Sequence, residues 1–199
     1  KAIFRLLKLA LKARSFDPAT VVRKMLRKGS NCKIHPTAVV EGCWLGDNVV
    51  IGANAVVRGC ILADGARVED LAIAEFAVLS ERAVVQRQAM VKFAVLGRSA
   101  AVGGVIQMGV LDQSAALKRG AYLMDLNLGG ETQIEWGDRR VVAPLGLIGC
   151  GVGSETTVGL GVSVAAGRWV SAQLQIVAGG GTILTQPKCE QRGMHVVKD

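Results

Sequence analysis

Aliphatic side chains recur at a step of about six residues through the middle of the chain. Leu45, Leu62, Leu79 and Leu96 are seventeen residues apart, and further aliphatic residues divide each interval into three steps. These residues are Ile51 and Val57, then Val68 and Ile73, and then Val85 and Val91. The middle interval steps by six, five and six, and its neighbours by six, six and five. An α-helix would repeat about every 3.6 residues and a simple strand about every 2. A step of six that closes after three steps predicts a solenoid with three short strands per coil.

The first block of this solenoid is predicted to span residues 31–117. Its corners carry residue pairs that tight turns favour, such as Asp47-Asn48 and Asp64-Gly65. Residues one coil apart should stack about 4.8 Å from each other. This spacing places Cys43, Cys60, Ala77 and Ala94 on a single ladder. Because no histidine or acid joins the ladder, we interpret it as an interior column of small residues and not as a metal site.

The six-residue step fails between residues 118 and 146. Lys118-Arg119-Gly120 ends the first block, and Pro144 closes the interruption. Within it, residues 132–136 and 139–142 predict a β-hairpin with a tight turn at Gly137-Asp138. Its charged residues suit a polar or phosphorylated ligand, although a trimer-contact or surface hairpin with solvated charges explains them equally well.

The step returns over residues 147–184 with eighteen-residue coils. The residues that carry it are Val152, Val158, Val164, Val170 and Ile176. The glycine-rich run at 149–153 lies in phase with this repeat and precedes no helix-forming run, which argues against a dinucleotide site. Residues 185–199 read as a polar C-terminal tail.

Composition narrows the class of protein. Of the 199 residues, 50% are hydrophobic and only 4% aromatic, which suits narrow coils and excludes a disordered chain. The sequence has no apolar run of about eighteen residues that would span a membrane. Five cysteines without a CxxC motif favour a reducing compartment, so we expect a cytoplasmic location.

Charge is concentrated in the first thirty residues, which carry nine Lys or Arg against the single acid Asp17. The rest of the chain is neutral, so we expect no nucleic-acid binding by the solenoid. Two helices are predicted within residues 1–30, the second starting at Asp17-Pro18 and stopping at Gly29. The first has a basic face made by Lys1, Arg5, Lys8 and Lys12. Residues 1–14 therefore either lie on an anionic membrane surface, or pack on the end of the solenoid or on an upstream domain with their charges solvated.

Three segments carry a family resemblance: Ile34 to Glu41, Leu45 to Val50 and Ile51 to Val56. They resemble the hexapeptide-repeat superfamily, which includes acyltransferases and the C-terminal domains of sugar-nucleotidyltransferases. The resemblance implies a left-handed parallel β-helix over residues 31–184 that forms a homotrimer. It also implies an acyl-CoA-dependent acyltransferase acting on a sugar or nucleotide-sugar. A non-catalytic trimeric scaffold or regulatory domain, and the β-helix domain of a sugar-nucleotidyltransferase, stay open as alternatives.

Candidate site residues follow from this resemblance, because loops that leave the coils often cover a neighbouring subunit's active site in such proteins. The family commonly uses a histidine base in the middle coils, but the two histidines here are His35 in the opening motif and His195 near the end. The catalytic candidates are therefore Glu131, Asp125 and His35. The substrate-binding candidates are Asn127, Trp136, Arg139 and Arg140. The candidates for holding acyl-CoA are Gly161, Ala165, Ala166 and Gly179, and no metal is expected because His and Cys are scattered.

Overall fold

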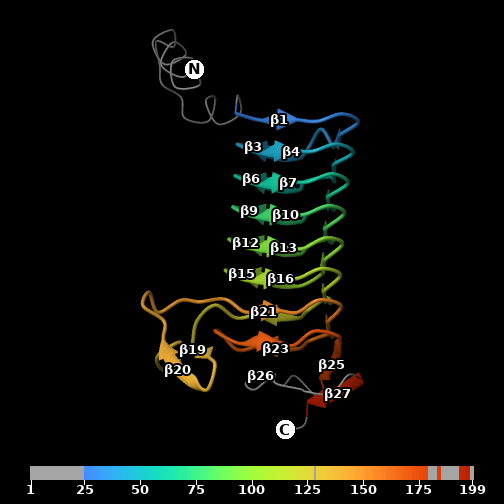
Figure 1. Cartoon of the computed structure of the whole chain (residues 1–199). Helices are drawn as coiled ribbons and strands as arrows, with labels where there is room; N and C mark the ends of the chain where they lie inside the picture. Colours follow the sequence, from blue (N-terminus) through green and yellow to red (C-terminus); the bar gives the residue numbers. More distant parts are fainter. Residues whose placement is uncertain (1–24, 128, 179–182, 185–192, 198–199) are drawn as a thin grey trace.

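The computed structural model describes residues 25–127, 129–178, 183–184 and 193–197, and these form a column of stacked coils (Figure 1). Short strands build three parallel sheets, one on each side of the coils. Sheet A contains β1 (Arg27–Lys28), β4 (Trp44–Leu45), β7 (Ile61–Leu62), β10 (Val78–Leu79), β13 (Val95–Leu96), β16 (Val110–Leu111), β21 (Gly151–Val152) and β24 (Trp169–Val170). Sheet B contains β2 (Lys33–Ile34), β5 (Val50–Ile51), β8 (Arg67–Val68), β11 (Val84–Val85), β14 (Ala101–Val102), β17 (Ala116–Leu117), β22 (Thr157–Val158), β25 (Leu174–Ala178) and β27 (Gly193–Val197).

The third side of the column is sheet C. It contains β3 (Val39–Glu41), β6 (Val56–Arg58), β9 (Ile73–Glu75), β12 (Met90–Lys92), β15 (Val105–Gln107), β18 (Tyr122–Leu123), β23 (Ser163–Val164) and β26 (Ile183–Leu184). Each strand pairs with the strand of the same side in the next coil. The predicted all-β parallel solenoid is confirmed, and its three-sided coils are consistent with a left-handed β-helix.

In most coils the core consists of one larger aliphatic side chain per strand and a smaller side chain, usually Ala, Cys or Val, just before the strand. Leu45, Leu62, Leu79 and Leu96 are buried in sheet A and stack in register, as the seventeen-residue spacing predicts. Small residues at the corners, such as Ala66, let the chain bend tightly between two sheets. Burial of apolar surface at about 25 cal/mol per Å² is the main force that stabilises these stacks.

One interior position differs from the prediction. Ile73 is only half-buried, and Ala74 takes the interior position between Val57 and Val91. The coil therefore keeps the regular steps of six, six and five. Because successive side chains point to opposite faces of a strand, the register fixed by the neighbouring coils overrides the larger side chain of Ile73.

The cysteine ladder is confirmed as an interior column. Cys43 and Cys60 are buried, and their thiols donate to the carbonyl oxygens of Val57 and Ala74 at 3.4 and 3.2 Å. The hydrogen bond that the Cys60 thiol donates to the Cys43 sulfur, together with burial, raises the pKa of Cys60 well above its ordinary value. Across the described ranges, no three His, Cys, Asp or Glu residues gather where they would hold a metal ion.

The corners adopt the left-handed backbone that their residues favour. Asn48, Gly65 and Ser99 have φ of 58°, 70° and 57°, which confirms the turns predicted there. The hairpin is also confirmed, as β19 (Gln133–Trp136) and β20 (Arg139–Val142) pair across the Gly137-Asp138 turn. The eighteen-residue coil of the second block is confirmed by the pairing of Gly151 with Trp169.

Three boundaries differ from those predicted. β1 lies inside the segment predicted to be helical and pairs with β4, so the solenoid starts before residue 31. Lys118 to Ala121 form an ordinary corner between β17 and β18, so the first block continues to Leu123. The predicted polar tail contains β27, which pairs with β25 and extends sheet B. In each case strand pairing with a neighbouring coil sets the boundary, and the residue pattern within a single segment does not show that pairing.

The N-terminal predictions largely fall outside the described residues, since these begin at residue 25. The first helix, its basic face and the start of the second helix all lie in residues 1–24. Within the described part of the chain, no helix has the length and apolar character needed to cross a membrane.

The outer faces of two sheets differ in character. On sheet C, Glu41, Arg58, Glu75 and Lys92 form a ladder of alternating charge with ion-pair distances of 2.9, 3.4 and 3.0 Å. On sheet A, exposed apolar side chains follow the coils from β4 to β24. This apolar stripe consists of Trp44, Ile61, Val78, Val95, Val110 and Trp169.

Candidate functional site

The longest departure from the coils runs from Asp125 to Gly149, between β18 and β21, and contains the β19–β20 hairpin (Figure 1). Its two ends are tied together, because the Ile148 amide donates to the Asp125 carbonyl oxygen at 2.8 Å. Within the loop, Thr132 is buried and its hydroxyl accepts a hydrogen bond from the Asn127 amide at 3.1 Å. One hydrogen bond therefore closes the base of the loop, and a second one orders its interior.

Arg168 fixes the hairpin to the second block. Its guanidinium donates to the Gln133 carbonyl oxygen at 3.0 Å, and its Nε lies 3.8 Å from a Glu135 carboxylate oxygen. Both side chains are largely buried, with exposed fractions of 11% and 16%. The backbone adds one contact, since the Glu135 amide donates to the Gly167 carbonyl oxygen at 3.3 Å. The hairpin is consequently a fixed part of the molecule at this corner.

The predicted substrate residues occupy this loop in different settings. Asn127 is exposed, and its side-chain oxygen accepts a hydrogen bond from the Gly129 amide at 3.1 Å. Arg139 and Arg140 are exposed on β20, where they pair in register with Trp136 and Glu135. The side chain of Trp136 lies outside the described part of the structure. The two arginines thus present positive charge on an outer strand of the hairpin.

The catalytic candidates do not form one group. Asp125 is half-buried at the start of the loop, and Glu131 is exposed just before β19. His35 lies in the first coil, with Nδ1 2.9 Å from the Thr37 hydroxyl oxygen. Five coil steps, or about 24 Å, separate its level on sheet B from β17, which precedes the loop. Within one subunit, His35 therefore cannot act together with the two carboxylates.

Three of the predicted cofactor residues, Gly161, Ala165 and Ala166, lie on corners of the second block. Gly161 has φ of 69°, and an added Cβ there would meet no atom within 4 Å, so its backbone is open to a ligand. Ala165 is half-buried and Ala166 is buried, so Ala166 offers little surface for contact. Gly179 lies outside the described residues. Of this set, Gly161 has the setting that best fits close approach of a long ligand to the backbone.

A second candidate site comes from a change in corner length between sheets B and C. Residues 86–89 connect β11 to β12 and residues 118–121 connect β17 to β18, but only Gly103 and Gly104 connect β14 to β15. The short corner is recessed between two full ones and leaves a cavity of about 250 Å³. The residues that line this corner recess are Arg87, Gln88, Gly103, Gly104, Val105, Arg119, Gly120, Ala121 and Tyr122.

The floor of the corner recess requires glycine. An added Cβ at Gly104 would overlap the carbonyl oxygen of Ala121, and one at Gly103 would lie 3.2 Å from the Arg119 amide nitrogen. The floor still takes part in the hydrogen-bond ladder, because the Gly103 amide donates to the Leu117 carbonyl oxygen at 2.6 Å and the Gly104 carbonyl oxygen accepts from the Met90 amide at 3.1 Å. The recess is thus a regular part of the ladder, one coil of which is two residues shorter.

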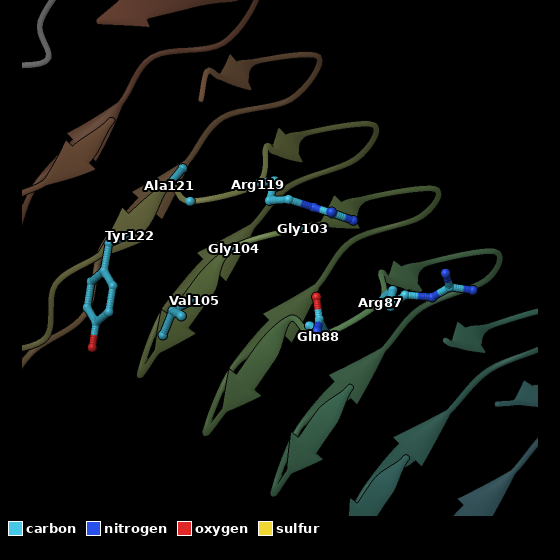
Figure 2. Close-up of a pocket in the computed structure, with 9 residues that line it drawn as sticks. Arg87, Gln88, Gly103, Gly104, Val105, Arg119, Ala121 and Tyr122 are labelled. Carbon is cyan, nitrogen blue, oxygen red and sulfur yellow. The ribbon is translucent and has the colours of Figure 1, made fainter. Parts of the chain in front are cut away.

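Two guanidinium groups flank the corner recess. Figure 2 shows Arg119 extending across the Gly103 corner and Arg87 extending to the same side from the coil on the other wall. The Arg87 guanidinium pairs with the Asp70 carboxylate at 3.0 Å. Backbone hydrogen bonding to the Ala53 amide and the Arg87 guanidinium hold the pKa of Asp70 below its ordinary value. Asp70 therefore stays ionised at neutral pH and orients Arg87 at the wall.

Sequence reasoning missed both Arg168 and the corner recess, although each leaves a signal. Arg168 occupies the corner position where the coils before it carry Cys43, Cys60, Ala77 or Ala94, so it is the large polar residue on a small-residue ladder. The recess shows as a coil of fifteen residues, since Val95 pairs with Val110. A comparison of coil lengths, and not of residue types, would have revealed it.

Comparison with known proteins supports the resemblance stated from the sequence. Residues 29–59 match the family model described as bacterial transferase hexapeptide (six repeats). The structure continues the same coils well beyond that match, which confirms the resemblance to the hexapeptide-repeat superfamily. No curated protein sequence matches the chain.

Solved structures with a similar fold include several transferases. The acetyltransferase domain of PglB from Neisseria gonorrhoeae is 17% identical over 59% of this chain and 57% of that one, with a TM-score of 0.38. UDP-N-acetylglucosamine acyltransferase from Francisella novicida is 12% identical over 81% of this chain and 61% of that one, with a TM-score of 0.47. A hexapeptide transferase family protein from Anaplasma phagocytophilum is 13% identical over 76% of this chain and 78% of that one, with a TM-score of 0.25. The chain thus spans less than two thirds of the first two, and the likeness concerns the fold alone.

Proposed function

We propose that the chain is a hexapeptide-repeat acyltransferase that moves an acyl group from acyl-CoA to a sugar or nucleotide-sugar. The observation that carries the proposal is the match of residues 29–59 to a transferase hexapeptide model, continued by the coils of the structure. The fixed loop 125–149 adds a polar segment beside the second block, which suits an acceptor-binding element.

Calorimetric titration with acetyl-CoA tests this proposal directly. Saturable binding of about one ligand per subunit is expected, because acyl transfer requires a donor site of this kind. Gly161 is expected to contribute, since its backbone is open at a corner of the second block. Gly161→Val should weaken acetyl-CoA binding, whereas Gly137→Val, at an equally open glycine of positive φ on the hairpin tip, should not. Absence of binding at millimolar acetyl-CoA would refute the donor assignment.

For the acceptor step, we propose that Glu131 or Asp125 acts as the general base. Both carboxylates belong to the fixed loop, whereas His35 is remote from it. Loss of a general base lowers kcat by a factor of about 10² to 10⁴. Glu131→Gln or Asp125→Asn should show such a loss with little change in KM for the acceptor. Asp138→Asn, on the exposed hairpin turn, is the matched control and should retain activity.

A homotrimer is the assembly we propose, and the apolar stripe on sheet A supports an interface between copies. Exposed apolar surface of this extent on consecutive strands is typical of interaction sites. Sedimentation should give about three times the 20.9 kDa mass of one chain. Val95→Lys, in the middle of the stripe, should reduce that mass, whereas Val84→Lys on the outer side of sheet B should not. A monomeric mass for the unaltered chain would exclude the trimer.

Two further proposals concern alternatives left open by the sequence. A trimeric scaffold or the β-helix domain of a sugar-nucleotidyltransferase becomes the better explanation if acetyl-CoA does not bind but the trimer forms. Membrane attachment is proposed for residues 1–14, on their basic face. Vesicles of phosphatidylcholine with phosphatidylserine should co-sediment with the full chain, and deletion of residues 1–14 should abolish this. Unchanged co-sedimentation after the deletion would exclude the role of these residues.

A further inference from the structure

We propose that the corner recess at Gly103-Gly104 binds the phosphate group of a small molecule, at a site separate from the loop 125–149. This site does not depend on the acyl transfer proposed above. It rests on three features of the described residues: the shape of the recess, the charge on its walls and its place on the solenoid.

The shape suits a group of limited size. The cavity of about 250 Å³ lies just below the range of about 300–1,000 Å³ found for pockets that enclose whole drug-sized ligands. A phosphate or diphosphate group therefore fits it, and the rest of a larger molecule would lie outside. Because Gly103 and Gly104 carry no side chain, the ligand can approach the backbone of the floor closely.

The charge favours phosphate over a neutral ligand. Arg87 and Arg119 stand on opposite walls of the recess, and within the described ranges the Arg119 side chain makes no ion pair or hydrogen bond. The acids nearby are already engaged, as Asp70 pairs with Arg87 and Glu69 accepts a hydrogen bond from the Arg87 amide at 3.0 Å.

Two arginines suit phosphate for a geometric reason. A guanidinium presents a planar fork of donors that matches two phosphate oxygens, so Arg119 can bind a phosphate directly while Arg87 adds positive charge from the opposite wall. The Gln88 side-chain amide adds a neutral hydrogen-bonding group to the same lining, whereas the Tyr122 hydroxyl lies 3.5 Å from Gln107 Nε2.

The place of the recess keeps it accessible. It lies at the corner between sheets B and C, which is the corner opposite the apolar stripe on sheet A. Copies that pack through sheet A would therefore leave the recess open to solvent. On one side the lining includes Gly120, which lies next to Gly161 of the following coil: a Cβ added to Gly120 would be 3.7 Å from the Gly161 nitrogen. Exposed glycine backbone therefore continues from the cavity to the next corner.

Calorimetric titration of the full chain with inorganic pyrophosphate tests the site. We expect saturable binding that weakens by a factor of about ten or more in Arg119→Gln, since hydrogen bonds to charged groups contribute that much. Arg87→Gln should have a similar effect. Arg98→Gln is the matched control, because Arg98 lies 3.6 Å from Glu81 at another corner and its loss changes net charge equally. No saturable binding, or an equal loss in Arg98→Gln, would overturn the proposal.

A second variant removes the recess and keeps the coils. A four-residue corner copied from Gln86 to Ala89 would replace Gly103-Gly104 and restore the seventeen-residue coil. This variant should keep its far-UV circular dichroism and lose pyrophosphate binding, and retained binding would overturn the proposal.

Competition identifies the source of the phosphate. Coenzyme A and UDP are each titrated against bound pyrophosphate, and displacement by either supports the site and names its ligand class. Displacement by neither would overturn the proposal. If UDP alone displaces pyrophosphate and acetyl-CoA shows no binding, the phosphate site stands and the acyl-CoA proposal fails.

Discussion

Gly104 offers a sharp test of how the short corner is packed. In Gly104→Ala, the added methyl group would overlap the Ala121 carbonyl oxygen and lie 3.0 Å from the Lys118 carbonyl oxygen. The Ala121 oxygen cannot move aside freely, because it accepts a hydrogen bond from the Val105 amide at 3.0 Å. The substitution must therefore either strain two coils or break a bond of the sheet C ladder.

The magnitude follows from these contacts. Overpacking a well-packed interior costs about 1–3 kcal/mol, and loss of one backbone hydrogen bond costs about 1 kcal/mol more. We therefore expect Gly104→Ala to lower the free energy of unfolding by about 2–4 kcal/mol. For a chain of this size, each kcal/mol lowers Tm by about 2–4 °C, so the expected fall in Tm is about 4–16 °C.

Thermal unfolding followed by far-UV circular dichroism measures this change. Gly129→Ala is the control, because its added Cβ would meet only the Asn127 side-chain oxygen, at 3.7 Å, and Gly129 has no positive φ. The control should shift the free energy of unfolding by less than about 0.5 kcal/mol. Equal Tm values for Gly104→Ala and Gly129→Ala would refute the close packing of the two coils at this corner.

Three further predictions concern other parts of the molecule. Arg168→Ala should expose the hairpin to limited proteolysis between residues 129 and 142, because it removes the bond to Gln133; an unchanged cleavage pattern would contradict the anchoring role. Glu75→Gln should lower stability by about 1 kcal/mol at pH 7 by removing two ion pairs, as measured by urea unfolding. Because Lys92 and Arg58 hold the pKa of Glu75 below its ordinary value, the stabilisation is present at neutral pH and disappears as pH falls below about 4; a pH-independent difference would contradict this. Leu79→Ala should cost about 2–5 kcal/mol, because its side chain is fully buried between two coils, and a cost below about 1 kcal/mol would contradict that packing.

The sequence predicted the solenoid well because its evidence is repeated in every coil. The seventeen-residue spacing of Leu45, Leu62 and Leu79 reports the stacking in register directly. The hairpin was predicted to within one residue, since a Gly-Asp turn between two strand-forming runs is a local signal. These features depend on residues close in sequence or on a period that is easy to read.

The features that the sequence analysis missed depend on contacts between coils. The sequence pattern assigns Ile73 to the core, but Ala74 is the residue that pairs with Val57 and Val91 and therefore lies inside. Arg87 and Arg119 are thirty-two residues apart in the sequence. They line one recess only because the corner between them, Gly103-Gly104, is two residues shorter than the corners on either side. The separation of His35 from Asp125 and Glu131 is different, because it already follows from the number of coils between them.

Unequal coils have a consequence for how such a protein changes over generations. Coils of 15, 17 and 18 residues, and one of 41, all return their strands to the same alignment. Deletions and insertions at a corner can therefore accumulate in evolution while the strand pairing of the other coils stays the same. In this architecture a deletion is itself a way to create a new feature: the loss of two residues opens a hollow at a vertex, while the gain of about two dozen produces an arm.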